Sequence, residues 1–118
     1  MTTTPSSTTY SPGDLVKVRI RFTAGASTKT RPAVILSDTA YHASRRDALV
    51  MPVSTKRADM YHGDHDLADW KSAGLPAPSK AKCTLDTIDR ATIKGTYGKL
   101  SDADFAHVKA NLRSVLGL

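Results

Sequence analysis

Side chains able to do chemistry fall in three short segments of this sequence. Arg31 carries a guanidinium, which stays charged at any working pH and can donate two parallel hydrogen bonds to a phosphate. Ser54 and Thr55 supply adjacent hydroxyls, each able to donate to a phosphate oxygen. The segment 62–66, His-Gly-Asp-His-Asp, gathers side chains that suit zinc or a harder cation. The first two segments suit an anionic substrate, and the third suits a metal.

Each segment also has an ordinary structural explanation. Arg31 would close a strand with a surface ion pair, and hydroxyls at a strand end commonly complete local turns. The 62–66 segment lacks an accompanying Cys pair or HExxH motif, and Gly63 favours a turn. We therefore expect its side chains to be solvated, although either His62 or His65 could transfer a proton near neutral pH.

The charge balance favours a polyanionic partner. Seventeen Lys and Arg face eleven acids, all of them Asp, which gives a formal net charge of +6. A surplus of this size suits nucleic acid, although many small basic proteins bind none.

Length and composition predict one domain that crosses no membrane. The 118 residues suffice for one modest core, and no apolar run approaches the roughly 20 residues that span a bilayer. Residues 1–10 are rich in Ser, Thr and Pro, so we expect a disordered tail rather than a signal peptide, followed by one domain over 11–118. The single cysteine, Cys83, cannot form an internal disulfide, which fits a reducing cytoplasm.

The first half of the chain predicts three strands. Alternation over 15–22 indicates a half-buried strand with cations at every second position, roughly 6.8 Å apart. Those cations, Lys17, Arg19 and Arg21, either follow successive phosphates of an extended nucleic acid or form a solvated face. Residues 23–30 read as a polar loop, 33–36 and 48–53 as further strands, and 41–47 as a polar connection.

The second half predicts shorter elements and one clear helix. A short helix is expected over 67–73, capped by Asp66 and stopped by Gly74, with short strands over 81–85 and 91–93. Trp70 would anchor that helix in the core, or else stack on an RNA base. Ser101 and Asp104 resemble a capping box before an amphipathic terminal helix. The pattern is mainly β (α+β), a compact antiparallel sheet or small barrel with helical packing.

Several motifs, in this order, closely resemble the MazF/PemK/Kid toxins of type II toxin–antitoxin systems. They are Gly-Asp-Leu-Val at 13–16, Arg-Pro-Ala-Val-Ile-Leu-Ser at 31–37 with Tyr41, and Met-Pro-Val-Ser-Thr at 51–55. The C-terminal stretch also fits, with Thr-Ile-Asp at 87–89, Gly-Lys-Leu-Ser at 98–101, Asp104 and the closing helix. The resemblance covers roughly residues 10 to 118.

This resemblance implies an SH3-like antiparallel β-barrel with a short helix and a C-terminal helix, assembled as a homodimer in the cytoplasm. It implies a sequence-selective endoribonuclease, or mRNA interferase, that cuts single-stranded RNA by attack of the 2′-hydroxyl. Such a reaction needs no metal or cofactor, because the nucleophile belongs to the substrate. The implied partner is a cognate antitoxin of the MazE/PemI type.

Arg31 matches the catalytic arginine of that family, and Ser54 stands at the position of its catalytic threonine. Thr55 is the alternative if the register differs by one residue. Four polar or basic residues on the neighbouring loops suit the phosphates of RNA and are expected to bind it: Thr28, Lys29, Lys56 and Arg57. The loop 24–30 lacks the His or Glu of some members, and Thr84 and Asp86 near Cys83 do not convincingly replace the Asp of others. The general acid and base therefore stay unassigned.

A function of another class fits the same fold. The related CcdB toxins share it but poison gyrase, and a non-catalytic SH3-like binding module would share it as well. The pairing of RPAVIL with Pro-x-Ser favours the nuclease.

Overall fold

The computed structural model describes residues 9–21, 28–55 and 57–118, and its centre is one antiparallel sheet. The sheet runs in the order β4–β5–β3–β2–β1–β7, and β6 pairs with β3 beside β5. Its strands are β1 (Asp14–Arg21), β2 (Thr28–Ile35), β3 (Asp47–Ser54), β4 (His65–Asp66), β5 (Lys80–Ala81), β6 (Asp86–Asp89) and β7 (Gly95–Lys99). Two α-helices, α1 (Thr39–Ser44) and α2 (Asp102–Leu116), and one 3-10 turn (Arg90–Thr92) complete the fold. The predicted mainly β class with a C-terminal helix is confirmed.

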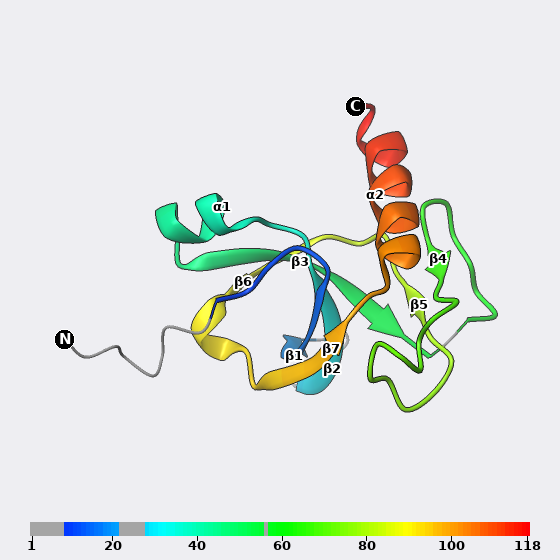
Figure 1. Ribbon diagram of the computed structural model, residues 1–118, viewed down its shortest axis with the longest axis horizontal. Coiled ribbons are helices and arrows are strands. Elements are labelled where there is room, and N and C mark those ends of the chain that lie inside the picture. Colours follow the sequence, from blue (N-terminus) through cyan, green and yellow to red (C-terminus); the bar gives the residue numbers. More distant parts are fainter. Residues whose placement is uncertain (1–8, 22–27, 56) are drawn as a thin grey trace.

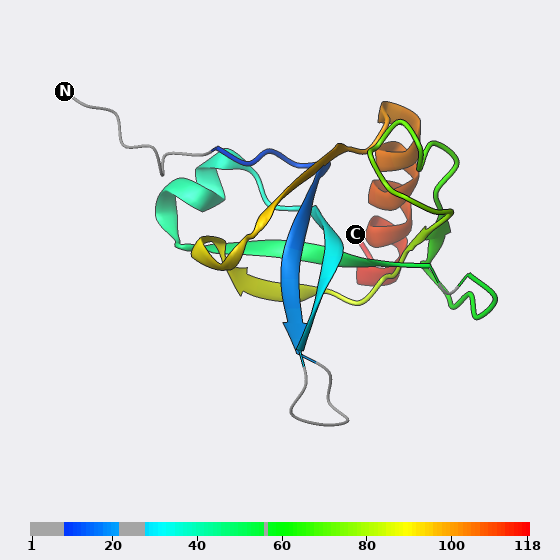
Figure 2. The same ribbon diagram turned by 90° about the horizontal axis from the view of Figure 1, so that it is seen from below.

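β3 is the strand that connects the two ends of the molecule. It runs from the side of α1 to the side of β4 and β5 (Figure 1). Figure 2 shows β1 and β2, in blue and cyan, running across the direction of β3, as in a strongly curled sheet. Pro52 lies within β3, and β3 leaves the β2 ladder there: Ala33–Pro52 is the last pair with β2, and Val53 and Ser54 pair with β5.

The sheet has a core cluster on each face. Successive side chains of a strand point to opposite faces, so β1, β2 and β3 contribute to both clusters. One core cluster contains Leu15, Val34, Met51, Val53, Leu67, Ala73, Leu75, Ala81, Leu100 and Val108, and α2 packs there. The other contains Val16, Val18, Ala33, Ile35, Ala48 and Val50, with Tyr10 against it. The three predicted early strands are therefore present. β2 begins earlier than expected, at Thr28, so the predicted polar loop is wrong over residues 28–30.

The helix predicted over 67–73 is wrong. These residues form consecutive turns, in which Ala73 N–H donates to Asp69 and Leu75 N–H donates to Trp70. The N–H groups of Ala68 and Asp69 donate instead to the Asp104 carboxylate, so a tertiary contact outweighs local propensity. Trp70 is half-buried and packs against the first core cluster, as a core anchor would, but the helix that it was expected to anchor is absent.

A short helix lies elsewhere, at α1, inside the segment predicted as a polar connection. Its N-cap is Asp38, whose side chain accepts from Tyr41 N–H at 2.9 Å. The strands predicted over 81–85 and 91–93 are also misplaced, since residues 90–92 form the 3-10 turn and Gly95 and Gly98 lie within β7. Glycine has low strand propensity, which hid that strand.

The terminal helix α2 begins at the predicted cap. Ser101 Oγ accepts from Asp104 N–H at 3.1 Å, and Gly117, with φ of 73°, ends the helix. The Asp104 carboxylate turns away from the predicted capping box toward residues 65–69. Across the described residues, no helix is long and apolar enough to cross a bilayer.

Candidate active site

Arg31 and Ser54 lie on neighbouring strands, at the point where the two strands part. The β2–β3 ladder pairs Ile35 with Val50 and Ala33 with Pro52, and Arg31 and Ser54 each lie two residues beyond that last pair. Pro32 has no N–H to donate toward β3, which explains why the ladder stops there. The two residues to which the resemblance assigned catalytic roles therefore both lie just beyond the end of this ladder.

The two side chains also share one face of the sheet. Arg31 alternates with Ala33 and Ile35, and Ser54 alternates with Pro52 and Val50, so both belong to the face of the second core cluster. Arg31 is half-buried, and the residue paired with it on β1 is the buried Val18.

The cations of β1 lie on the opposite face. Lys17 and Arg19 alternate with the buried Val16 and Val18, so they point away from the face that carries Arg31. Lys17 Nζ lies 5.2 Å from the centre of the Tyr97 ring, and Arg19 is exposed. These contacts favour the solvated-face interpretation over one shared groove with Arg31.

A small cavity adjoins Ser54. It has a volume of about 120 Å³ and is lined by Ser54, Asp59, Tyr61, Lys80 and Lys82. Thr55 follows the end of β3 and is exposed, whereas Ser54 is half-buried. Ser54 therefore lines a cavity, as expected for the first-choice hydroxyl of the sequence analysis.

The expected RNA-binding residues have different surroundings. Lys29 is exposed on β2, two residues from Arg31 and on the same face. Thr28 pairs with Arg21 at the start of β2, and Lys56 lies outside the described residues. Arg57 is exposed, with Nε 3.5 Å from an Asp66 carboxylate oxygen. Of these residues, Lys29 is the one that shares a strand and a face with Arg31.

The 62–66 segment forms a turn, as Gly63 suggested, with φ of 93° at that residue. Its acidic and imidazole side chains are engaged in separate contacts. The Asp64 carboxylate accepts from Lys80 Nζ at 3.3 Å and from Cys83 N–H at 2.8 Å, while His65 Nε2 donates to Asp104 at 2.8 Å. Among the described residues no three His, Cys or Asp side chains are placed to hold one metal ion.

Electrostatics around the turn follow from burial and hydrogen bonding. Burial acts to raise the pKa of Asp64, but the N–H groups of Cys83 and Tyr61 and the Lys80 ammonium outweigh it and hold the pKa below its usual value. Burial, with the Asp64 charge, raises the pKa of the Cys83 thiol. Cys83 is therefore a poor candidate for a reactive thiolate.

Sequence reasoning did not identify Lys80 and Lys82 as site residues. Lys80 pairs with Ser54 across β3 and β5, and only 2% of it is exposed. The alternation Lys-Ala-Lys over 80–82, with Ala81 in the core, was the available signal. It was weak because lysine is rarely buried.

Comparisons with known proteins identify the family to which the chain belongs. The family model for the PemK-like, MazF-like toxin of type II toxin–antitoxin systems matches residues 11–116. Among solved structures, MazE–MazF (Form-II) from Deinococcus radiodurans is similar, with a TM-score of 0.70, 25% identity and coverage of 95% of this chain and 99% of that one. An endoribonuclease in complex with its cognate antitoxin, from a mycobacterial species, has a TM-score of 0.75 at 14% identity, with coverage of 92% and 96%.

A third similar structure is the Mycobacterium tuberculosis toxin MazF-mt6, with a TM-score of 0.70, 17% identity and coverage of 89% and 97%. No curated protein sequence matches significantly. The family match spans nearly the whole chain, and it includes the strands that carry Arg31 and Ser54. The chain therefore belongs to the PemK-like, MazF-like toxin family of type II toxin–antitoxin systems.

Proposed function

We propose that this protein is a cytoplasmic endoribonuclease toxin that cuts single-stranded RNA at selected sequences. The observation that carries the proposal is the position of Arg31 and Ser54 on neighbouring strands and on one face of the sheet, in a chain of this toxin family. The similar mycobacterial structure described as an endoribonuclease supports the same activity.

The reaction is a transesterification within the RNA. The 2′-oxygen bonds to the adjacent phosphorus and the bond from phosphorus to the 5′-oxygen breaks. A proton leaves the 2′-hydroxyl and another reaches the 5′-oxygen, giving a 2′,3′-cyclic phosphate and a 5′-hydroxyl. The charge that grows on the non-bridging oxygens must be stabilised by the protein.

Arg31 and Ser54 supply that stabilisation. The Arg31 guanidinium stays charged and can donate two parallel hydrogen bonds to the phosphate. The Ser54 hydroxyl can donate to a non-bridging oxygen, as a threonine at this position would. Because Arg31 is half-buried, its interaction with the phosphate is less screened than that of an exposed cation.

The reaction requires no metal, because the nucleophile is the 2′-hydroxyl of the substrate. Purified protein should therefore cut labelled single-stranded RNA in EDTA and leave 2′,3′-cyclic phosphate ends. DNA of the same sequence should resist, since it lacks the nucleophile. Cleavage of that DNA, or RNA cleavage lost in EDTA and restored by zinc, would contradict the mechanism.

We also propose that a MazE/PemI-like antitoxin inhibits a homodimer of this toxin. The similar MazE–MazF complex supports such a partner. The net charge of +6 suits an antitoxin tail with acidic and apolar residues, which would fold onto the RNA-binding face. Adding tail peptide to a toxin–RNA complex should displace the RNA. Simultaneous binding of both would contradict a shared surface.

A further inference from the structure

Ser54 lies between two different groups of cations. β2, with Arg31, borders β3 on one side, and β5, with Lys80, borders it on the other. Lys82 N–H donates to the Pro52 carbonyl at 2.8 Å, so the register of β3 and β5 continues to Lys82. Lys82 is then the diagonal neighbour of Ser54 on the same face of the sheet, roughly 7–8 Å away, within reach of a long side chain.

The two lysines of the cavity differ in their partners. Lys80 is buried and its charge is matched, because Nζ lies 3.3 Å from the Asp64 carboxylate and also donates to the Asp59 carbonyl. Lys82 is half-buried and lines the same cavity, and its ammonium has no hydrogen bond or ion pair with any residue in the described parts of the chain. A half-buried lysine that lines a cavity and has no counter-ion favours an anionic ligand there.

The wall of the cavity is a turn held in place by this ion pair. Asp64 accepts from Tyr61 N–H at 3.0 Å within the turn and from Cys83 N–H at 2.8 Å across to the segment after β5. Lys80 joins the same turn through Asp59 and Asp64. The backbone that carries Tyr61 is therefore fixed relative to Ser54.

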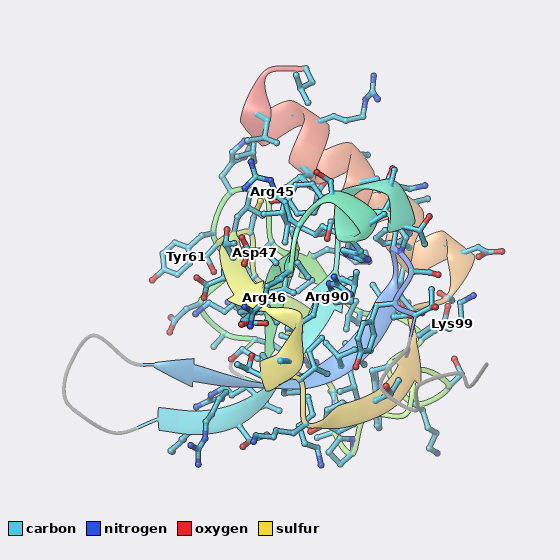
Figure 3. All side chains as sticks on the ribbon, turned by 90° about the vertical axis from the view of Figure 1, so that its left-hand side faces the viewer. Arg45, Arg46, Asp47, Tyr61, Arg90 and Lys99 are labelled. Carbon is cyan, nitrogen blue, oxygen red and sulfur yellow. The ribbon has the colours of Figure 1, made fainter. Side chains whose placement is uncertain are left out.

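Tyr61 is a large aromatic residue that lies on the surface instead of in the core. Its relative exposure is 72%, and Figure 3 shows the side chain projecting outward from the body of the molecule. Lys80 Nζ lies 5.6 Å from the centre of the ring. An exposed aromatic ring on a fixed turn, beside a cationic cavity, is typical of a surface on which a nucleobase stacks.

We propose that this cavity binds the nucleotide next to the scissile bond, with Lys82 contacting its phosphate and Tyr61 stacking on its base. The inference rests on the proposed function, which places the scissile phosphate at Arg31 and Ser54. The Lys80–Asp64 pair then acts as a positioning device that fixes the turn. Lys82 and Tyr61 contact the substrate beyond the bond that is cut.

The role of Lys82 is tested by binding of a short, random-sequence single-stranded DNA, which carries the phosphates but is not cut. Lys82→Gln should weaken binding by about tenfold and reduce the slope of log affinity against log salt by about 0.7, as expected for one lost phosphate contact. Lys82→Arg should keep both values near wild type. The matched control is Lys99→Gln, an exposed lysine on the opposite side of the molecule from Tyr61 (Figure 3).

The role of Tyr61 is tested with the same probe. Tyr61→Leu should weaken binding by about tenfold with an unchanged salt slope, because a stacked base but no phosphate contact is lost. Tyr61→Phe should bind like wild type, since the ring remains. Wild-type affinity and salt slope in both Lys82→Gln and Tyr61→Leu would overturn the inference.

RNA cleavage separates this inference from the proposed function. If wild type cuts RNA, Arg31→Ala does not, and both cavity variants cut as wild type does, the cavity proposal is wrong and the nuclease stands. If wild type cuts no RNA, the nuclease is wrong, and the DNA titrations still decide whether Lys82 and Tyr61 bind a nucleic-acid strand.

Discussion

The imidazole of His65 donates from Nε2 to the Asp104 carboxylate at 2.8 Å, and this bond joins β4 to the first turn of α2. Asp104 is 1% exposed and also accepts from the N–H groups of Ala68 and Asp69, at 3.0 and 2.8 Å. One carboxylate thus organises the turns where the sequence predicted a helix. β4, which carries His65, pairs with β5, and β5 contributes Lys80 to the Ser54 cavity.

Replacing Asp104 should therefore destabilise the whole domain. In Asp104→Asn the carboxamide can accept at one oxygen only, and its NH2 group meets donors, so we expect a loss of about 2–4 kcal/mol in the free energy of unfolding. Urea denaturation followed by circular dichroism measures this. The control is Asp102→Asn, an exposed residue in the same helical turn, which should change stability by less than about 0.5 kcal/mol. Equal effects of the two substitutions would contradict the role of Asp104.

His42 should make the fold sensitive to mild acid. Its Nε2 lies 2.7 Å from Ser37 Oγ, which also accepts from Leu49 N–H at 3.0 Å. Burial, and then the charge of Arg90, lower the pKa of His42 from 6.5. The unfolded chain therefore binds this proton more readily, and the stability from a neutral His42 is present above pH 6.5 and lost as pH falls below it.

The measurement is the free energy of unfolding between pH 7 and pH 5. Wild type should lose stability over this range, and His42→Gln, which can still accept from Ser37, should lose less. Below that range, Asp64 and Asp104 add to the loss, because the pKa of each is held below 3.8 in the folded state. An identical pH profile in the two proteins would contradict the assignment to His42.

Gly98 should tolerate no side chain. A Cβ there would lie 2.6 Å from the Ala73 carbonyl oxygen, because β7 packs directly against the turns over 68–74. Gly98→Ala should cost about 1–3 kcal/mol in the free energy of unfolding. Gly95→Ala, in the same strand, meets no atom within 4 Å and should be close to neutral. Thermal unfolding of the two variants makes the comparison, and an equally stable Gly98→Ala protein would contradict this packing.

The sequence predicted the early strands because their patterns are local. Alternation over 15–22 and the apolar run over 33–36 need no knowledge of the rest of the chain. The helix over 67–73 was predicted from equally local signals. It is wrong because a carboxylate 35 residues away in sequence takes the N–H group of Asp69.

The candidate site divides in the same way. Arg31 and Ser54 were assigned through motifs on β2 and β3, and the pairing of these two strands comes from the folded sheet. The sequence did not indicate Lys80 and Lys82 as site residues, because they reach the Ser54 cavity only through the pairing of β5 with β3. No short-range pattern indicates that β5 pairs there.

The central claim is tested most directly by RNA cleavage in EDTA with Arg31→Ala. Loss of this charge at the scissile phosphate should lower the rate by at least 10²–10³-fold, on the order of one lost transition-state donor. The control, Arg45→Ala, removes an exposed arginine next to α1, at the other end of β3 from Ser54, and should cut like wild type. A folded Arg31→Ala protein that cuts RNA at the wild-type rate would contradict the assignment of this site.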